Sequence, residues 1–394
     1  MKTIIYTASL VLSLTTATVP AQDIYDPVLN SIEQKSKTLK TLQQRHLAQR
    51  IANKTGLTPS NPDVEWGYFG GHPSELGIKQ VLSVKQSLDF PTVYLHKKKL
   101  SDTQNRKAEY EYRLQRMELM LSAKKLCIEL IRYNSLTRLY NNLAENARRI
   151  AEAYDKMHKS GSVNILEYNK AMLNLTNVEN KLRLLDLEKE TLLSELAVLN
   201  GGEKIGFDHA VFPSIGSLPD FESYYSEAEQ GSPVLLLQKE EEEVDERRLR
   251  LTKSETLPKL AIGYMGEFVT GERFQGITVG VSIPLWENKN RIREAKAGLL
   301  ATRSATREIK TEHLHYHRNL HSRARMLLQN IERYNTALSS NRNDTLLFKA
   351  YSEGEISLLT YLLEVEYFFE AYEEKLNTER DLALVQAELT AYRL

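Results

Sequence analysis

SGSVNILEY at residues 160–168 is followed, about 193 positions later, by EGEISLLTY at residues 353–361. A second pair of similar stretches lies at nearly the same offset, with NPDVEWGY at residues 61–68 and LPKLAIGY at residues 257–264. Similar landmarks that share one offset indicate a duplicated unit. Each unit combines two short segments of strand character with very long helical segments. The sequence therefore predicts a wall built from repeats, not a pocket built for catalysis.

The N-terminal residues 1–21 have the pattern of a secretory signal peptide. Lys2 precedes a mostly apolar run from Ile4 to Leu14, and small residues precede an expected cleavage before Gln22. The run is too short to cross a membrane as a helix. A buried N-terminal helix is the alternative, but Pro20 would interrupt it. We therefore expect the mature chain to leave the cytoplasm.

The composition argues against several classes of protein. The 52 basic and 52 acidic residues balance and are interspersed, as on solvated helix faces. The sequence contains no cluster of basic residues that would predict a nucleic-acid partner. Cys127 is the single cysteine, so neither an intramolecular disulfide nor a cysteine-rich metal site can form. The sequence contains no nucleophile elbow, no phosphate-binding glycine loop and no CxxC motif. We expect neither an enzyme nor a bound cofactor.

Long helices account for most of the chain. Residues 92–158 contain neither proline nor glycine, and a helix of that length would span roughly 100 Å at 1.5 Å per residue. A heptad seam runs along its second half. Its members are Leu136, Leu139, Leu143, Ala147, Ile150, Tyr154 and Met157. The return helix ends at Gly201. Together with a first helix at residues 24–54, it matches the length of the long helix.

The second half repeats this plan, and the boundaries follow from it. We expect a first repeat at residues 22–202, a connector at 203–231 and a second repeat at 232–394. The first repeat holds a helix, a strand pair at 62–90 and a helical hairpin at 92–200. The second holds a helix, a strand pair at 258–286 and a helical hairpin at 288–394, whose long leg is expected over 288–351. Each unit would present two helical columns of equal height. Four columns per chain are too few to enclose a wide lumen, so closure needs several copies.

The strand pairs predict contact with lipid. Residues 277–283 alternate strictly, with apolar side chains on one face and small or polar ones on the other. The apolar members are Ile277, Val279, Val281 and Ile283. Such alternation, with no amphipathic partner segment nearby, is typical of a transmembrane β-barrel. Four strands cannot close a barrel alone, so several chains must contribute strands. The alternation in the first strand pair is weaker.

In this order and at this spacing, the residues resemble the TolC-like outer-membrane efflux proteins. The features that carry the resemblance are the duplication, the VSIPLW strand end at residues 281–286, and two turns of the form Gly-x-Val/Ile-x-x-Leu-x-Tyr. The resemblance extends from about Ile24 to the C-terminus. It implies a mainly α fold with a small transmembrane β part. Three copies would form a twelve-stranded β-barrel in the bacterial outer membrane, in contact with its lipid, continuous with an α-helical barrel in the periplasm.

The resemblance also implies a function and partners. The chain would be the exit duct of a tripartite efflux pump, through which small molecules or metal ions pass without energy input from the chain. Its partners would be two further copies, a periplasmic adaptor of the membrane fusion type and an inner-membrane transporter of the resistance-nodulation-division type. An exit channel for type I secretion is the alternative. A periplasmic coiled-coil adaptor is a further one, although adaptors normally carry a single hairpin.

The glycine turns are the first candidate sites. Glycine accommodates the left-handed conformation that ends a helix, which would explain both turns without any function. The resemblance adds that an adaptor docks on these exposed tips. The residues expected to take part are Gly161, Val163, Leu166, Gly354, Ile356 and Leu359.

Charged residues beside the turns are candidates for a periplasmic gate. Asp155, Lys156 and Lys159 on one hairpin could form ion pairs with Glu353 and Glu355 on the other and hold the pore shut. Ordinary surface charge is the alternative, since exposed ion pairs contribute little.

Two further clusters have a plain interpretation and a functional one. His313, His317 and His321 share one helical face at a spacing that can bind zinc or copper. We expect no metal there and interpret the cluster as a solvated or lumen-lining stripe. The acidic run from Glu240 to Glu243 is likewise expected to be a solvated helix face, and a cation-attracting stretch of lumen is its alternative.

Overall fold

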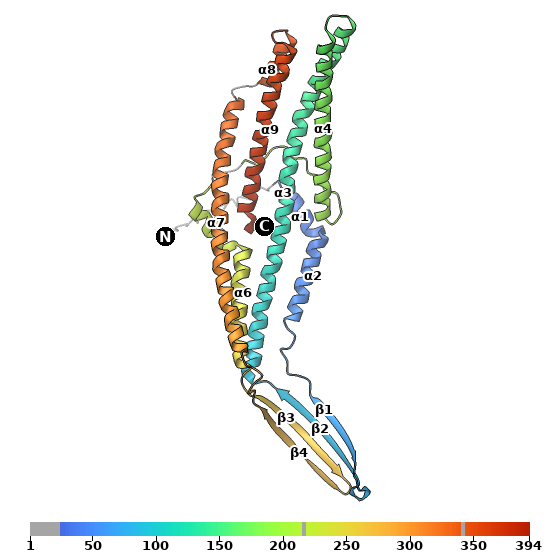
Figure 1. The fold of residues 1–394 in the computed structure, drawn as a ribbon, viewed down its shortest axis with the longest axis vertical. Helices are drawn as coiled ribbons and strands as arrows, with labels where there is room; N and C mark the ends of the chain where they lie inside the picture. The colour runs from blue at the N-terminus through green and yellow to red at the C-terminus, as the bar shows by residue number, and fades with distance from the viewer. Residues whose placement is uncertain (1–23, 215–217, 340–342) are drawn as a thin grey trace, which may run out of the picture.

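The computed structural model describes residues 24–214, 218–339 and 343–394, so the expected signal peptide lies outside the described residues. The molecule is a long rod of helices with a sheet at one end (Figure 1). Within the described ranges, no helix combines the length and the apolar character needed to cross a membrane.

The two halves of the chain present their elements in the same order. The first half contains α1 (Asp26–Lys35), α2 (Lys37–Ala52), β1 (Asp63–Gly70), η1 (Ser74–Leu76), β2 (Ile78–Leu88), α3 (Pro91–Lys159) and α4 (Ile165–Leu199). The second contains α5 (Phe221–Gly231), α6 (Pro233–Ser254), β3 (Lys259–Val269), β4 (Glu272–Ser282), α7 (Arg291–Ser339), α8 (Asn343–Ser352), α9 (Leu358–Leu389) and η2 (Ala391–Arg393).

The α3 helix forms the spine of the first half. It runs for 69 residues, begins with a proline in its first turn and ends just before Gly161. Helices α1 and α2 lie along its lower part, and α4 lies along its upper part (Figure 1). In the second half, α6 lies along the lower part of α7, and α9 along the upper part. The expected stacking of two short helices against one long helix is therefore present.

One predicted helix is interrupted within the described residues, and a second includes residues outside them. The helix expected at residues 24–54 breaks at Ser36, whose hydroxyl accepts a hydrogen bond from the Leu39 amide and so caps α2. Gly201, at the end of α4, faces this break so closely that a Cβ atom there would lie 2.4 Å from the Lys35 carbonyl oxygen. The helix expected at 288–351 appears as α7 and α8, on either side of residues 340–342, which lie outside the described part.

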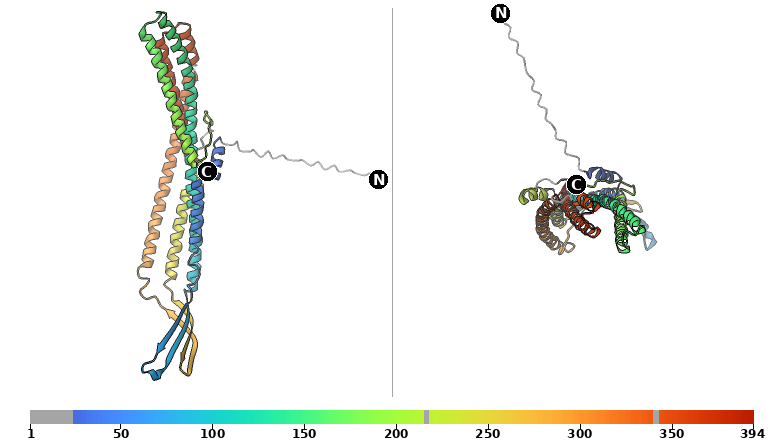
Figure 2. Two further views of the ribbon diagram at one scale, coloured as in Figure 1. Left: turned by 90° about the vertical axis from the view of Figure 1, so that its right-hand side faces the viewer. Right: turned by 90° about the horizontal axis from the view of Figure 1, so that it is seen from above.

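The main core lies at mid-height, where the connector crosses the helices. Tyr25, Ile128 and Leu196 pack there with Phe207 of the connector. The side-chain amide of Asn134, on α3, donates hydrogen bonds to the carbonyl oxygens of Phe207 and His209 at 3.0 and 2.9 Å. These bonds fasten the connector to one side of the rod (Figure 2).

The acidic run on α6 is not a solvated face. Glu240 is buried and accepts a hydrogen bond from Arg106 of α3 at 3.0 Å. Glu241 forms an ion pair with Lys107 at 2.9 Å, and Glu242 forms one with Arg303 of α7 at the same distance. The run therefore joins α6 to a helix on each side. The prediction of a solvated face is wrong, because the opposite charges come from helices distant in sequence.

The sheet is antiparallel with the order β1-β2-β3-β4. The β3–β4 connection consists of Thr270 and Gly271, and Gly271 adopts a φ of 88°. This short turn extends β4 to Glu272 at its start, and the strand ends at Ser282, before the Pro284 that follows it. The strand pair expected at 258–286 is therefore present as β3 and β4, and it ends four residues earlier than expected, at Ser282.

Candidate functional site

The register of the sheet brings apolar side chains from all four strands to one face. Val64 lies opposite Val84, Val84 lies opposite Tyr264, and Tyr264 lies opposite Ile277. Directly opposed residues of antiparallel strands share a face. The apolar face comprises Val64, Trp66, Tyr68, Leu82, Val84, Leu260, Ile262, Tyr264, Ile277, Val279 and Val281. The first strand pair thus contributes to the face despite its weaker alternation.

This apolar face is open to the surroundings of the single chain. All eleven residues of β4 are exposed, and the side chain of Ile277 is 79% exposed. Trp286, just beyond β4 at the end nearest the helices, is 80% exposed. A contiguous apolar patch of this kind marks a surface that is covered by lipid or by another protein.

The opposite face of the sheet is mostly polar or small, although it also carries the apolar residues Phe69, Val81, Met265, Val269 and Phe274. Glu65 lies opposite Ser83, and Lys85 lies opposite Gly263, which in turn faces Thr278. An ion pair of 2.8 Å between Lys79 and Glu267 lies at the far end from the helices. Such a face is compatible with water.

The sheet has two edges at which no strand of the described residues pairs. The order β1-β2-β3-β4 leaves one side of β1 and one side of β4 without a ladder. Exposed edges of long apolar strands pair readily with another chain.

The two hairpin tips share one geometry. Gly161 and Gly354 adopt φ values of 74° and 77°. At each tip the amide after the glycine donates to a carbonyl five residues earlier, from Ser162 to Met157 at 2.8 Å and from Glu355 to Ala350 at 2.9 Å. This is the Schellman pattern of helix ends. The following helices are capped by the side chains of Asn164 and Ser357.

The predicted docking residues cluster at these tips. Leu166 and Leu359 are largely exposed, while Val163 and Ile356 are half-buried. An aromatic pair stabilises the turn below each tip. His158 stacks on Tyr168 with 5.0 Å between ring centroids, and Tyr351 stacks on Tyr361 with 5.1 Å. Sequence analysis did not identify these two pairs.

The charged residues predicted to form a gate interact within their own helices. Lys159 binds Asp155 at 2.7 Å, and the Glu353 carboxylate lies 3.8 Å from Lys349. Lys156 and Glu355 are exposed. Over the described ranges, no ion pair joins these residues across the two hairpins.

A groove between the two hairpins was not predicted. It has a volume of about 720 Å³ and is lined by residues of α3, α4 and α9. Val178 of α4 and Val365 and Phe369 of α9 contribute apolar surface. Lys181 of α4 and Glu373 of α9 approach to 3.6 Å across it. The groove depends on contacts between distant helices, which local spacing cannot reveal.

The histidine stripe lies against the connector, not in solvent. His317 and His321 are 8% and 3% exposed, respectively. The Tyr225 hydroxyl lies 3.2 Å from His313 Nδ1, and Tyr224 is hydrogen-bonded to His317 Nδ1. The prediction of a solvated or lumen-lining stripe is wrong, because α5 covers this face of α7. Over the described residues, no group of three or more histidine, cysteine or carboxylate side chains is arranged to hold a metal ion.

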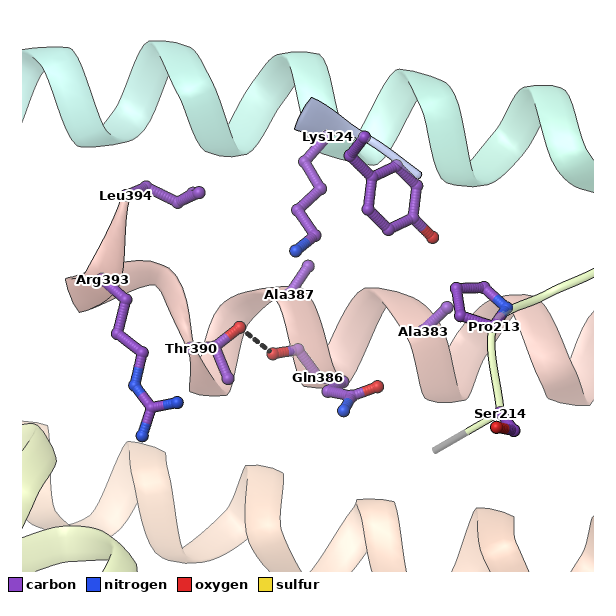
Figure 3. A pocket seen from close by; sticks show the side chains of 10 residues that line it. Lys124, Pro213, Ser214, Ala383, Gln386, Ala387, Thr390, Arg393 and Leu394 are labelled. Carbon is purple, nitrogen blue, oxygen red and sulfur yellow. Dashed lines mark hydrogen bonds between the residues drawn. The ribbon is translucent and has the colours of Figure 1, made fainter. Parts of the chain in front are cut away.

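A smaller cavity of about 340 Å³ lies between α3, α9 and the connector. Lys124, Thr390 and Arg393 line it together with two alanines of α9 (Figure 3). The Arg393 guanidinium binds Glu227 at 2.8 and 2.9 Å, and Lys124 Nζ lies 4.8 Å from the ring centroid of Tyr25. The polar groups thus contact other parts of the chain. In the neighbouring core, burial raises the pKa of the Cys127 thiol to about 12, so this thiol is not a nucleophile at neutral pH.

Comparison with solved structures identifies the fold. The sequence itself matches no family model and no curated protein. The structure is similar to the outer-membrane channel OprN, with a TM-score of 0.77 and 14% identity over 94% of this chain and 89% of that one. It is also similar to the CmeC outer-membrane channel of Campylobacter jejuni, with a TM-score of 0.74 and 15% identity over 94% of this chain and 85% of that one. The outer-membrane protein VceC of Vibrio cholerae matches with a TM-score of 0.70 and 14% identity over 93% of each chain.

These similarities assign the chain the fold of TolC-type outer-membrane channels. The fold class expected from the sequence, mainly helical with a small antiparallel sheet, is confirmed.

Proposed function

We propose that the protein is the outer-membrane channel of a tripartite efflux pump, through which small molecules or metal ions pass by diffusion. The observation that carries this proposal is the sheet, which has one exposed apolar face, one mostly polar face and two edges at which no described strand pairs. A soluble protein would cover such an apolar face with a helix or a second sheet. The described elements instead leave the sheet projecting from the end of the rod (Figure 1).

The dimensions of the sheet fit an outer membrane. Strands β3 and β4 each contain 11 residues, which corresponds to roughly 36 Å along the strand. At the usual tilt of about 40° in a membrane barrel, this length spans roughly 28 Å, close to the apolar band of about 25 Å. The aromatic side chains of Trp286 at one end and of Trp66 and Tyr68 toward the other would lie near the two interfaces.

Closure of the barrel requires further copies, and the helical part supports the same arrangement. Helices α4 and α7 lie at opposite lateral edges of the wall (Figures 1 and 2). Both carry exposed large apolar side chains, among them Leu173, Leu187, Leu300 and Met326. Two different edges that meet head to tail generate a closed ring when the rotation permits. Three copies would supply twelve strands and a helical barrel of the same symmetry.

The tips and the groove are the surfaces that we assign to the periplasmic adaptor. Their exposed leucines and the open groove between α4 and α9 present apolar contacts at the end of the rod opposite the sheet. The energy for transport would come from an inner-membrane transporter of the resistance-nodulation-division type. The protein itself would not be an enzyme.

Disulfide trapping at the strand edges tests the proposal. Cysteines are placed one at a time on β1 and on β4, for example Glu65→Cys and Thr278→Cys, and are then combined in one chain. Oxidation of the double variants in outer-membrane vesicles should give covalent dimers and trimers. Each single variant is the matched control and should give none. Recovery of the chain in the soluble fraction after osmotic shock, with no crosslinking at any pair of edge positions, would contradict the proposal.

A further inference from the structure

The connector helix α5 is fastened to α7 through histidines. His313, His317 and His321 face α5 from α7, and Phe221, Tyr224 and Tyr225 of α5 pack against them. The rings of His313 and His317 lie side by side, with 4.3 Å between their centroids. The stripe therefore forms a continuous contact surface for α5.

The hydrogen bonds of this contact fix the protonation of His317. The Tyr224 hydroxyl donates to the carbonyl oxygen of Leu389 at 3.0 Å. Because a hydroxyl has one proton, its oxygen accepts from Nδ1–H of His317. The neutral imidazole then carries no proton on Nε2. One turn further along α7, His321 Nε2 donates to the carbonyl oxygen of Pro219 at 2.8 Å.

A second proton on these rings would be unfavourable while α5 is in place. His317 is buried, so a charge on it would lose its hydration. Charges on His313 and His317 would also repel each other across their short separation. Burial, with the neighbouring His313, lowers the pKa of His317 to about 4, and burial lowers that of His313.

Other charged groups around the contact are paired with partners of their own. Glu222 lies near Arg318, Glu229 pairs with Lys310, and Glu227 pairs with Arg393. From α9, Glu388 accepts from Tyr316 and binds Lys125 of α3. Two carboxylates work against the lowered pKa values. The charge of Glu229 raises the pKa of His313, and that of Glu388 raises the pKa of His317, because both favour the charged imidazole. Arg323 and Tyr392 lie nearby, as do Asp220 at the start of α5 and His315 of α7.

We propose that this contact is an acid-sensitive clamp, in which neutral His313 and His317 hold the connector helix α5 on α7 and their protonation releases it. The clamp also reaches the end of the second hairpin, because Tyr224 bonds to Leu389 at the C-terminal end of α9. Release of α5 would therefore loosen the base of the α7–α9 pair. The proposal stands independently of the channel function.

The direction and size of the effect follow from proton linkage. The released histidine has the ordinary pKa of about 6.5, and the docked His317 has a lower one, so the released state binds more protons. Docking is then strongest above pH 6.5 and weakens as the pH falls toward 4. For His317 alone, the docking constant should be about 30-fold lower at pH 5 than at pH 7.5. His313 acts in the same direction.

Amide hydrogen exchange on the full mature chain in detergent micelles tests the clamp. Protection of α5, corrected for the intrinsic exchange rate, is measured at pH 7.5 and at pH 5.0, with α4 as the internal reference. The expected result is a loss of protection of more than tenfold in α5 and little change in α4. A wild-type α5 that keeps its protection at pH 5.0 would overturn the proposal.

Two variants separate the histidines from the carboxylates. The double variant His313→Asn/His317→Asn keeps a neutral donor near the Nδ1 position and should make the protection of α5 independent of pH. If the double variant loses protection at pH 5.0 as the wild type does, the clamp is refuted. Glu229→Gln tests the same point without altering the histidines. It should retain the acid-induced release, and abolition of that release would also refute the clamp.

Discussion

Gly161 and Gly354 show how single residues shape the ends of the rod. Each adopts a positive φ, and nothing lies within 4 Å of the position that a Cβ atom would occupy. A side chain would therefore fit, and only the backbone conformation disfavours it. The structural reason for these glycines is thus complete without reference to a partner, and docking at the tips remains a proposal.

Replacement of Gly161 by alanine should lower the free energy of unfolding of the tip by about 1 kcal/mol, because alanine disfavours the left-handed region. Gly298 provides a matched control, since it lies inside α7 and also has open space around its Cβ position. Gly298→Ala should stabilise the protein by about 0.5–1 kcal/mol. Thermal unfolding of the two variants should show shifts of opposite sign. Equal shifts in the unfolding temperature of the two variants would show that the left-handed conformation of Gly161 does not decide its preference for glycine.

The exposed leucines of the tips give a second prediction at this scale. Leu166→Asp and Leu359→Asp should each weaken adaptor binding at least tenfold, because a charge would replace a buried apolar contact. Val211→Asp is the control, since Val211 is also an exposed apolar residue but belongs to the connector and not to a tip. Adaptor binding to immobilised channel measures the effect. Wild-type affinity in both tip variants would refute docking at these residues.

At the scale of elements, local patterns predicted what depends on neighbours in sequence and failed for what depends on distant partners. The alternation at residues 277–283 and the heptad seam of α3 both identified their elements correctly. The acidic run at Glu240 was misjudged because Arg106 and Arg303 reach it from other helices. The histidine stripe was misjudged because a short helix in the connector covers it.

The helix break at Ser36 also involves a residue distant in sequence. Its cap is local, but the break also lies against Gly201, where a Cβ atom would collide with the Lys35 carbonyl oxygen. The partner lies far along the chain, so the composition of residues 24–54 gave no sign of it. The break at Ser36 and the buried charges are thus the parts of this fold that sequence reasoning could not supply.

The two faces of β4 allow a matched test of the membrane assignment. Val279→Lys places a charge on the apolar face, and Thr278→Lys places one on the polar face of the same strand. The first should destabilise the membrane-inserted protein by about 2–4 kcal/mol, while the second should be tolerated. Refolding into lipid vesicles measures the difference. Equal effects of the two lysines would show that the faces are not divided between lipid and water.

At the scale of the whole molecule, sheet and helices lead to the same architecture by separate routes. The sheet has two edges at which no strand of the described ranges pairs, and the helical wall has two lateral edges with exposed apolar residues. A single chain therefore leaves the edges of both the sheet and the helical wall open. The rotation that relates one copy to the next would cover both sets of edges at once. The similarity to solved outer-membrane channels concerns the fold of the single chain.

The most direct test is the mass of the purified mature chain, measured by light scattering in detergent with the detergent contribution subtracted. The full chain has a mass of 45.2 kDa, so the account predicts a particle close to three times the mass of the processed polypeptide. It also predicts aggregation when detergent is removed, because the apolar face of the sheet would then meet water. A stable monomer in plain buffer would contradict the central claim that this sheet is one part of a shared membrane barrel.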